Sequence, residues 1–519
     1  MASSLSSASF AIRSFRFSSA TATVYERHGY AAASMRRLLL ALALVFTAPA
    51  AAATIHRVHG TTGNDFIQAA WGGKATVDCG RGFDVVSADL GDKVGADCEV
   101  VSRRLSVDPS TNPSGQHETA VEPADAAWGT TVVATYQVDR FETGGASFIG
   151  FAVSNDSGRT WTRGLLPALT VESSPPGPER AASDPTVAYD AVHAVWLISA
   201  LTIEQGGTRV MVAHSSDGLH WSGPVTAAAG PSLDKDWITC DNSAASPYRG
   251  RCYDLYTDDD KNITVSQWSG DGGSTWSAPT RASGILVGTQ PVTLPNGTLV
   301  TIAGNYAGEQ ALTGTIESLR STDGGTTFTR TTVSSLTSAS NAPMRAISLP
   351  SLAIDGSGTL FAAWADCRFR PSCGANDIVV SSSTDGVTWT APARVPVAQP
   401  TSTLDAMIPG IGADPAHPGK LALVYAYYTP HSCASGACTL GIAFAQSPDG
   451  GASWTKPLQL DVEPMQLTWL AKAEGRMVGD YFAAAFAGGR VVPVFALAVA
   501  PTGARLHEAI FASSLHALG

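Results

Sequence analysis

One octet recurs six times along the chain, and this repetition constrains the fold more than any other feature. The copies read SNDSGRTW, SSDGLHW, SGDGGSTW, STDGGTTF, STDGVTW and SPDGGASW, the last at residues 447–454. Their aspartates are Asp156, Asp217, Asp271, Asp323, Asp385 and Asp449. Successive aspartates lie 52 to 64 residues apart. Repetition at a near-constant period indicates one structural unit that is used many times.

Each octet has the composition of a tight turn between two strands. A strand-like run precedes it, as in DIVVSSSTDG, and another follows it, as in TWTAPARV. An aspartate carboxylate accepts hydrogen bonds from turn N–H groups, and glycine adopts the positive φ that such turns require. The aromatic residue at the end can pack against the hairpin. We therefore expect the six aspartates to have a structural role.

The units predict an all-β chain. Two more strand-like runs precede each hairpin, as in SDPTVAYD and AVWLISAL. Each unit then has four strands, and four-stranded units repeated around an axis form a β-propeller. The sequence predicts seven blades, with the outer strand of the seventh supplied by residues 100–107. A six-bladed ring with an extra terminal hairpin is the alternative. Only 15% of the residues are charged, and 51 glycines and 30 prolines supply turns, as in all-β proteins.

The first 53 residues are typical of a targeting segment. Arg36 and Arg37 precede an apolar run, and an alanine-rich stretch follows it. This pattern predicts a secretory signal peptide with its start at Met35, preceded by an upstream extension. The later chain has no second apolar run of membrane-spanning length, so we expect a secreted protein without membrane insertion. The net charge of −11 argues against a nucleic-acid partner. We expect a monomer.

Eight cysteines fall into four close pairs along the chain. Local closure predicts the disulfides Cys79–Cys98, Cys240–Cys252, Cys367–Cys373 and Cys433–Cys438. The alternative is a metal site at Cys433 and Cys438 with the neighbouring His431, but no second ligand pair follows. Disulfides agree with an exported protein.

The octet S-x-D-G-G-x-x-W resembles the Asp-box, or bacterial neuraminidase repeat. Residues 104–519 accordingly resemble secreted, sialidase-like bacterial propellers. Further phrases that fit this group are DPTVAYD, DKDWITCD, DCRFRPSCGANDIVVS and GRMVGDYFAAAF. The resemblance implies an exo-α-sialidase or a related glycoside hydrolase that acts on glycans. Asp-boxes also occur in non-catalytic propellers, so a protein that binds a glycan or a cell-surface protein is the alternative.

Sialidase chemistry implies a particular set of side chains. Three arginines hold the substrate carboxylate, a tyrosine activated by a glutamate attacks the sugar, and an aspartate transfers protons. The catalytic candidates in this sequence are Tyr481, Glu474, Asp184 and Asp236. The substrate-binding candidates are Arg345, Arg368, Arg476, Asp366 and Asp480. The family's F/Y-R-I-P motif is missing from the expected region, residues 117–128, and its nearest counterpart is MRAISLPS at residues 344–351.

Residues 54–103 differ from the repeats that follow. The phrases GTTGNDFI and GRGFDVV resemble a degenerate RTX, haemolysin-type repeat. In that family, aspartates and backbone carbonyls bind Ca²⁺ between stacked turns, and the calcium candidates here are Asp65, Asp84 and Asp89. A metal-free β-solenoid pinned by Cys79–Cys98 is the alternative. No other cofactor is expected.

Overall fold

The computed structural model describes residues 55–204, 206–308, 311–433 and 437–518, and these are folded almost entirely into strands. The helices in these ranges are two 3-10 turns, η1 (Pro371–Cys373) and η3 (Leu467–Trp469). No helix within the described part of the chain has the length and apolar character needed to span a bilayer. The predicted signal peptide lies outside the described residues.

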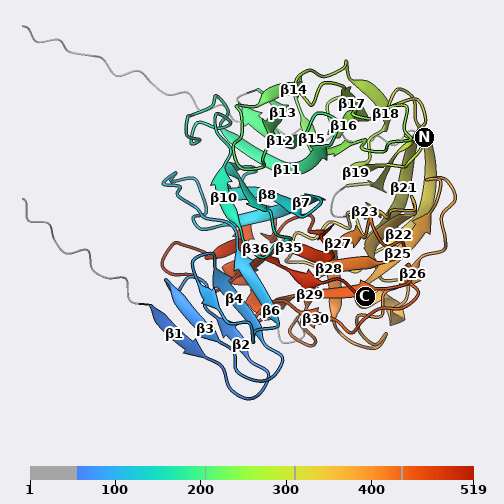
Figure 1. Cartoon of the computed structure of the whole chain (residues 1–519). Coiled ribbons are helices and arrows are strands. Elements are labelled where there is room, and N and C mark those ends of the chain that lie inside the picture. The colour runs from blue at the N-terminus through green and yellow to red at the C-terminus, as the bar shows by residue number, and fades with distance from the viewer. Residues whose placement is uncertain (1–54, 205, 309–310, 434–436, 519) are drawn as a thin grey trace, which may run out of the picture. The chain divides into compact units, whose positions relative to one another are not determined.

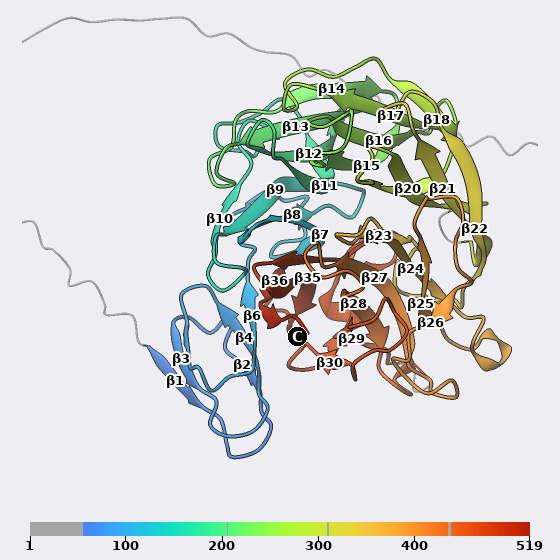
Figure 2. The ribbon, with the colours of Figure 1, turned by 45° about the vertical axis from the view of Figure 1, so that its right-hand side comes forward.

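Most strands belong to consecutive antiparallel groups, which Figures 1 and 2 show. The first two groups are β7 (Ala120–Trp128), β8 (Thr131–Arg140), β9 (Ala146–Ser154) and β10 (Thr162–Leu165), then β11 (Ala181–Asp190), β12 (Val195–Glu204), β13 (Gly207–Ser215) and β14 (Val225–Gly230). The third and fourth are β15 (Leu233–Cys240), β16 (Cys252–Asp258), β17 (Ile263–Ser269) and β18 (Thr280–Gly284), then β19 (Val287–Thr293), β20 (Leu299–Tyr306), β21 (Thr313–Ser321) and β22 (Thr329–Thr337).

The later groups repeat this order. They are β23 (Ser351–Ile354), β24 (Leu360–Asp366), β25 (Asp377–Ser383) and β26 (Ala393–Arg394), then β27 (Asp405–Ala413), β28 (Leu421–Tyr428), β29 (Thr439–Ser447) and β30 (Leu458–Gln459), and finally β34 (Ala483–Ala487), β35 (Arg490–Ala498) and β36 (Glu508–Ser513). Short strands complete the set: β31 (Met465–Gln466), β32 (Ala471–Lys472), β33 (Arg476–Met477) and β37 (Leu515–His516).

The first strand of each group contacts the first strand of the next. We call β7, β11, β15, β19, β23, β27 and β34 the inner strands, and β34 contacts β7 as well as β27. Repeated antiparallel sheets joined through their first strands form a β-propeller. The predicted fold class is therefore confirmed, while the blade count stays a prediction.

The last group takes its fourth strand from the start of the described chain. Strand β6 (Val100–Arg104) pairs antiparallel with β36, and Ser102 lies opposite Ser513 with their hydroxyls 2.8 Å apart. Figure 1 shows β6, in blue, beside β36. This pairing is the one expected for residues 100–107. Since β6 also pairs with β4, the predicted boundary between residues 103 and 104 falls inside a shared strand.

The segment before β6 is a small parallel β-coil. Strands β1 (His56–His59), β3 (Ala75–Asp78) and β5 (Lys93–Val94) form one parallel sheet, and β2 (Phe66–Gln68), β4 (Val85–Asp89) and β6 form another. Its carboxylates accept backbone N–H groups: Asp84 from Asp65 at 2.8 Å and Asp65 from Thr61 at 2.6 Å. Asp89 accepts from Arg104 at 2.5 Å. Calcium at these aspartates stays a prediction.

The four predicted disulfides are present: Cys79–Cys98, Cys240–Cys252, Cys367–Cys373 and Cys433–Cys438. Each aspartate of the six octets accepts hydrogen bonds from backbone N–H groups of its own turn. In the last octet, Asp449 accepts from Ser453 N at 2.7 Å, and the Trp454 indole donates to Gly451 O at 3.1 Å. These bonds satisfy turn groups that the sheets leave without a partner.

Candidate active site

Bulges near the start of the inner strands bring charged side chains together. The pairing register shifts in β7, β11 and β15, at the points where Glu122, Asp184 and Lys235 have φ of 55°, 47° and 56°. A bulge re-aims a side chain, and positive φ in a non-glycine residue costs backbone energy. The same bulge occurs in β19 at Gly288 and in β27 at Ile408, with φ of 71° and 52°, so it is a recurring feature of the inner strands that carries a charged side chain in β7, β11 and β15. We call Glu122, Asp184, Lys235, Asp236, Asp480, Tyr481 and Arg345 the inner-strand cluster.

Asp480 is the anionic centre of this cluster. Its carboxylate lies 2.7 Å from Lys235 Nζ, and Arg345 donates to both of its oxygens, at 3.0 and 2.8 Å. Burial acts to raise the pKa of Asp480, but the charges of Lys235 and Arg345 outweigh burial and lower it. Burial acts to lower the pKa of Lys235, and the charges of Asp480 and Asp184 raise it. Both cations are therefore already committed to protein carboxylates.

Tyr481 lies among the acidic members of the cluster. The side chain is buried, its hydroxyl donates to Pro185 O at 3.4 Å, and its ring meets Trp237 edge-on at 5.0 Å between centroids. Burial, followed by the charges of Glu122, Asp184 and Asp236, raises the pKa of Tyr481 well above its usual value. The phenol is therefore protonated at neutral pH, and an adjacent base is needed to make it a nucleophile.

A second pair of carboxyls shares one hydroxyl. Ser199 Oγ lies 2.6 Å from Asp236 Oδ2 and 2.6 Å from Asp254 Oδ2. A hydroxyl has one proton to donate, so the second contact requires that one of the two carboxyls is protonated. Burial raises the pKa of Asp254 to about 7, and burial with the charge of Asp254 raises the pKa of Asp236 well above its usual value. The pair therefore stores a proton beside Tyr481.

Glu122 is held by a polar chain that leads to Asp184. Gln137 donates to Glu122 and to Ser183 Oγ, and Ser183 donates to Asp184 Oδ1 at 2.6 Å. Arg140 in turn donates to Gln137 Oε1 at 2.8 Å. Burial, and then the charge of Asp184, raises the pKa of Glu122 well above its usual value. A raised pKa makes the ionised form of Glu122 a stronger base than an exposed glutamate.

The structure gathers some of the predicted residues and not others. Tyr481, Asp184, Asp236, Asp480 and Arg345 come together in the inner-strand cluster. Glu474, the predicted activating carboxylate, is exposed on a turn with φ of 57°. Among the carboxylates near Tyr481, Glu122 has the largest effect on the tyrosine pKa, which it raises.

The three predicted arginines do not converge. Arg368 forms an ion pair with buried Asp366, whose Oδ2 lies 2.6 Å from Nη2. Arg476 donates to Leu470 O at 2.8 Å, and its backbone O accepts from Arg345 N at 2.7 Å. Arg345 is thus the one predicted arginine that reaches the inner-strand cluster, and no three-arginine carboxylate clamp forms from this set.

Sequence reasoning missed Glu122, Lys235 and Asp254. A signal for Glu122 was present: the phrase V-E-P at residues 121–123 lies near the start of β7, as S-D-P at residues 183–185 lies near the start of β11. Aligning the two phrases would have matched Glu122 with Asp184. Lys235 stands one residue before a predicted candidate, and Asp254 comes from a second strand, β16, so spacing alone does not point to it.

Two cavities adjoin the inner strands. One, of about 10 Å³, has room for a single water-sized molecule. Four members of the cluster line it, together with Gln290 and Leu349: Asp184, Lys235, Asp236 and Tyr481. The other, of about 340 Å³, is lined by residues from all seven inner strands, including Trp128, Tyr189 and Asp125. Burial raises the pKa of Asp125 to about 7. The larger cavity has the size and aromatic walls of a small-molecule site.

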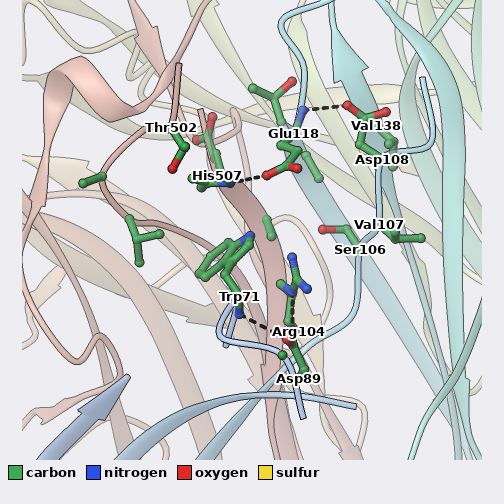
Figure 3. A pocket seen from close by; sticks show the side chains of 17 residues that line it. Trp71, Asp89, Arg104, Ser106, Val107, Asp108, Glu118, Val138, Thr502 and His507 are labelled. Atoms are coloured by element: carbon green, nitrogen blue, oxygen red, sulfur yellow. Dashed lines mark hydrogen bonds and ion pairs between the residues drawn. The ribbon is translucent and has the colours of Figure 1, made fainter. Parts of the chain in front are cut away.

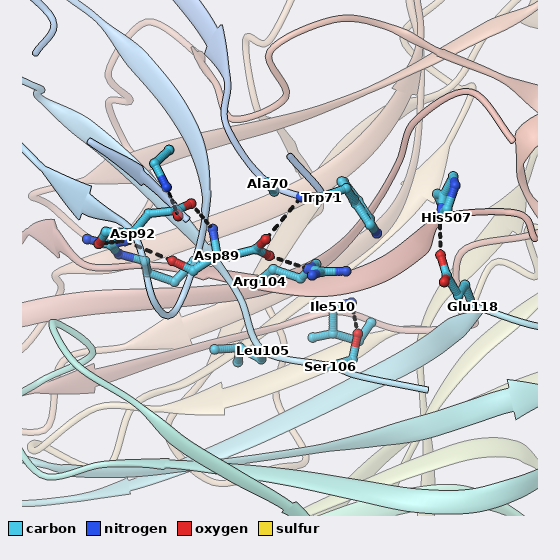
Figure 4. A network of polar contacts seen from close by, with 12 residues as sticks. Ala70, Trp71, Asp89, Asp92, Arg104, Leu105, Ser106, Glu118, His507 and Ile510 are labelled. Atoms are coloured by element: carbon cyan, nitrogen blue, oxygen red, sulfur yellow. Dashed lines mark hydrogen bonds and ion pairs between the residues drawn. The ribbon is translucent and has the colours of Figure 1, made fainter. Parts of the chain in front are cut away.

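A third cavity, of about 540 Å³, lies beside the β-coil (Figure 3). Trp71, Arg104, Glu118 and His507 are among its lining residues. Figure 4 shows the Arg104–Asp89 ion pair and the bond from Trp71 N to Asp89 at 3.1 Å. His507 and Glu118 pair as well, so most charged groups around this cavity are neutralised locally.

Comparison with known proteins identifies the repeat family. Residues 251–479 match the family described as "BNR repeat-like domain". No curated protein matches the chain.

Several solved structures are similar to the chain at low identity. The Hadza microbial sialidase Hz136 shares 16% identity at a TM-score of 0.39, with 77% of this chain and 66% of that chain covered. The NanB sialidase of Streptococcus pneumoniae shares 13% identity at a TM-score of 0.39, with 80% and 70% covered. A protein of unknown function from Dyadobacter fermentans shares 14% identity at a TM-score of 0.42, with 65% and 95% covered. The family match covers residues 251–479, which include four of the six octets, those of Asp271, Asp323, Asp385 and Asp449, so this part of the chain is similar to BNR-repeat proteins.

Proposed function

We propose that this protein is a glycoside hydrolase that acts on glycans at the inner-strand cluster. The observation that carries this proposal is the position of Tyr481 among buried carboxyls whose pKa values are driven in opposite directions. The pKa of Asp480 is lowered, while the pKa values of Glu122 and Asp236 are raised. Titratable groups driven apart in this way, on strained backbone, are typical of acid–base sites.

The arrangement assigns a role to each group. Tyr481 is the nucleophile, and Glu122 is the base that removes its proton. The Asp236–Asp254 pair holds a proton through Ser199 and supplies the general acid. Lys235 and Arg345 hold Asp480 ionised. This buried ion network fixes the position of Tyr481, which directly follows Asp480.

The substrate that fits this charge distribution is a neutral glycan. Recognition of sialic acid requires cations that are free to bind its carboxylate. Lys235 and Arg345 are both bound to Asp480, Arg368 is bound to Asp366, and Arg476 bonds a backbone carbonyl. We therefore favour the related glycoside hydrolase over the exo-α-sialidase.

One observation favours the non-catalytic alternative. The cavity beside Tyr481 holds about 10 Å³, whereas the cavity along the inner strands holds about 340 Å³. Trp128 is 46% exposed, and its ring lies 5.2 Å from that of Tyr189. Aromatic rings of this kind suit the apolar faces of sugars. A glycan-binding propeller without turnover is thus the second candidate.

A panel of fluorogenic glycosides separates these candidates. The panel contains neutral α- and β-glycosides and a sialoside, and binding of the same sugars is measured in parallel by calorimetry. We expect turnover of a neutral glycoside and none of the sialoside. Sialoside turnover would overturn the substrate assignment, and binding without any turnover would select the binding protein.

The compartment and partners follow from the same proposal. We propose that the chain is secreted by a bacterium as a monomer and meets glycans outside the cell. Four disulfides support this location, because cytosolic proteins rarely keep them. Identification of the mature N-terminus in culture medium tests the export step, and we expect it to follow the alanine-rich run that ends at residue 53.

A further inference from the structure

Three potential metal ligands gather outside the inner-strand cluster. Asp108, His117 and Asp139 each offer one ligand atom, and these atoms lie within 4.8 Å of one another. Asp108 and His117 belong to the segment between β6 and β7, and Asp139 lies near the end of β8. No part of the proposed hydrolysis uses them.

The spacing of these atoms suits ligands of a single ion. His117 Nδ1 lies 3.2 Å from Asp139 Oδ1 and 4.0 Å from Asp108 Oδ2. Ligands about 2.1 Å from a metal, at angles near 100°, stand roughly 3–3.5 Å apart. The shorter separation falls in this range, and the longer one fits a wider angle at the ion.

The closest two atoms are not hydrogen-bonded to each other. Asp139 is completely buried, and its Oδ1 has no hydrogen-bond partner; neither has His117 Nδ1. The structure also contains histidine–aspartate pairs that are hydrogen-bonded, such as His193 with Asp190 at 2.6 Å and His417 with Asp414 at 2.9 Å. Both atoms can offer a lone pair to a cation when the His117 ring is neutral and carries its proton on Nε2. A buried carboxylate oxygen left in this state is costly unless a cation meets it.

Hydrogen bonds hold both carboxylates in place, including one to Asp108 Oδ2 itself. Asp139 Oδ2 accepts from Ser147 Oγ at 2.6 Å, and Asp108 accepts from Ser110 N at 2.7 Å and Glu118 N at 2.6 Å. Figure 3 shows the bond from Glu118 N to Asp108. Hydrogen bonds of this kind orient metal ligands.

Space and charge at the group also fit an ion. A Cβ on Gly115 would stand 2.0 Å from Asp139 Oδ1, so a glycine there is needed for the carboxylate to keep its place. Burial, with the charge of Asp139, raises the pKa of Asp108. A bound cation would relieve the repulsion between the two carboxylates.

We propose that Asp108, His117 and Asp139 bind a divalent transition-metal ion, for which Zn²⁺ is the best fit. One imidazole nitrogen and two carboxylate oxygens are a common zinc donor set, whereas calcium prefers oxygen ligands alone. The ion joins the segment before β7 to β8 and so fixes the start of the first inner strand. Three protein ligands leave a fourth position for water.

Zinc binding by the untagged, chelator-treated chain tests this proposal. Zn²⁺ is titrated by calorimetry, with Ca²⁺ in a separate arm, and metal content is measured after dialysis. We expect one Zn²⁺ per chain, no comparable Ca²⁺ binding, and a higher unfolding temperature with Zn²⁺. His117→Ala and Asp139→Asn should each weaken zinc binding by at least about tenfold.

His417→Ala is the matched control, because His417 also pairs with one aspartate but lies 57% exposed at a different place in the chain. It should bind Zn²⁺ as the parent does. Absence of stoichiometric Zn²⁺ on the parent would overturn the proposal, as would unchanged affinity in His117→Ala. If Asp139→Asn does not fold, the visible absorption of the Co²⁺-loaded parent decides: a ligand-field spectrum that Zn²⁺ displaces supports the site, and its absence contradicts it.

Discussion

Lys235 and Asp480 form a buried ion pair, 2.7 Å between Nζ and Oδ2, that joins the third inner strand to the segment before the last. Their side chains are 5% and 0% exposed. Arg345 adds two hydrogen bonds to the same carboxylate. This pair organises the inner-strand cluster, since it fixes the residue that directly precedes Tyr481.

Lys235→Met should destabilise the protein strongly. It leaves Asp480 buried with Arg345 as its remaining cation, and loss of one partner of a buried pair costs about 3 kcal/mol or more. Chemical denaturation measures the change in the free energy of unfolding. Lys261→Met is the control, because the Lys261 side chain is 64% exposed while its partner Asp258 is 5% exposed, so water can replace the lysine and its loss should cost much less. Equal effects of the two substitutions would refute the assigned importance of the pair.

Asp254→Asn should reduce the pH dependence of stability. The folded-state pKa of Asp254 is raised to about 7, from about 3.9 in an unfolded chain. The native state therefore binds more protons than the unfolded state between these values, so this group makes stability fall as pH rises from about 4 to 7. The difference in unfolding temperature between pH 5 and pH 8 should be smaller in the variant. If the unfolding temperature changes between pH 5 and pH 8 by the same amount in the variant and the parent, the pKa of Asp254 is not raised in the folded protein.

Removal of the Cys79–Cys98 disulfide should loosen the β-coil. Nineteen residues separate the two cysteines in sequence, and closing a loop of this size stabilises by about 3 kcal/mol on the chain-entropy description. The double variant Cys79→Ser, Cys98→Ser should show faster amide hydrogen exchange in β3 and β4 than the parent. Removal of Cys433–Cys438, which are five residues apart, should leave that exchange unchanged. If the amide exchange rates in β3 and β4 are the same in the double variant and the parent, this prediction is wrong.

Arg368→Gln should leave glycan turnover and KM unchanged. The guanidinium neutralises Asp366 beside it and lies outside the inner-strand cluster. Arg345→Gln should lower kcat, because Arg345 holds Asp480 in place. Steady-state kinetics on the same glycoside compares the two. A large rise in KM for Arg368→Gln would show that Arg368 contributes to substrate binding.

The repeated octets were sufficient to predict the fold class. Six turns at a near-constant period require a repeated four-stranded unit, and the sequence also located the strand that completes the last group. The cysteine spacing was sufficient to predict the disulfides, because closing a short loop costs little entropy and each cysteine has one close neighbour in sequence.

The candidate site was only partly predictable from sequence. Asp184, Asp236, Asp480 and Tyr481 stand at inner-strand starts, so strand assignment located them. Glu122 and Lys235 depend on bulges with positive φ, which tertiary packing imposes and propensity does not reveal.

The remaining differences also come from packing across the chain. Ser199 and Asp254 enter the site from second strands of two different groups. The contact between β12 and β15 brings Ser199 to Asp236, and the pairing of β16 with β15 brings Asp254 there. Arg368 was misassigned to the substrate site because its local partner, Asp366, lies two residues away and was assigned there as well.

The central claim is that Tyr481 performs the reaction, and its hydroxyl can be removed with little change in shape. The most direct measurement is kcat of Tyr481→Phe on the glycoside that the parent hydrolyses, with the fold checked by circular dichroism. We predict a loss of at least about 100-fold in kcat with a retained fold, which is the scale of a lost catalytic group. A Tyr481→Phe variant that keeps the parent's kcat would contradict the assignment of this cluster as the active site.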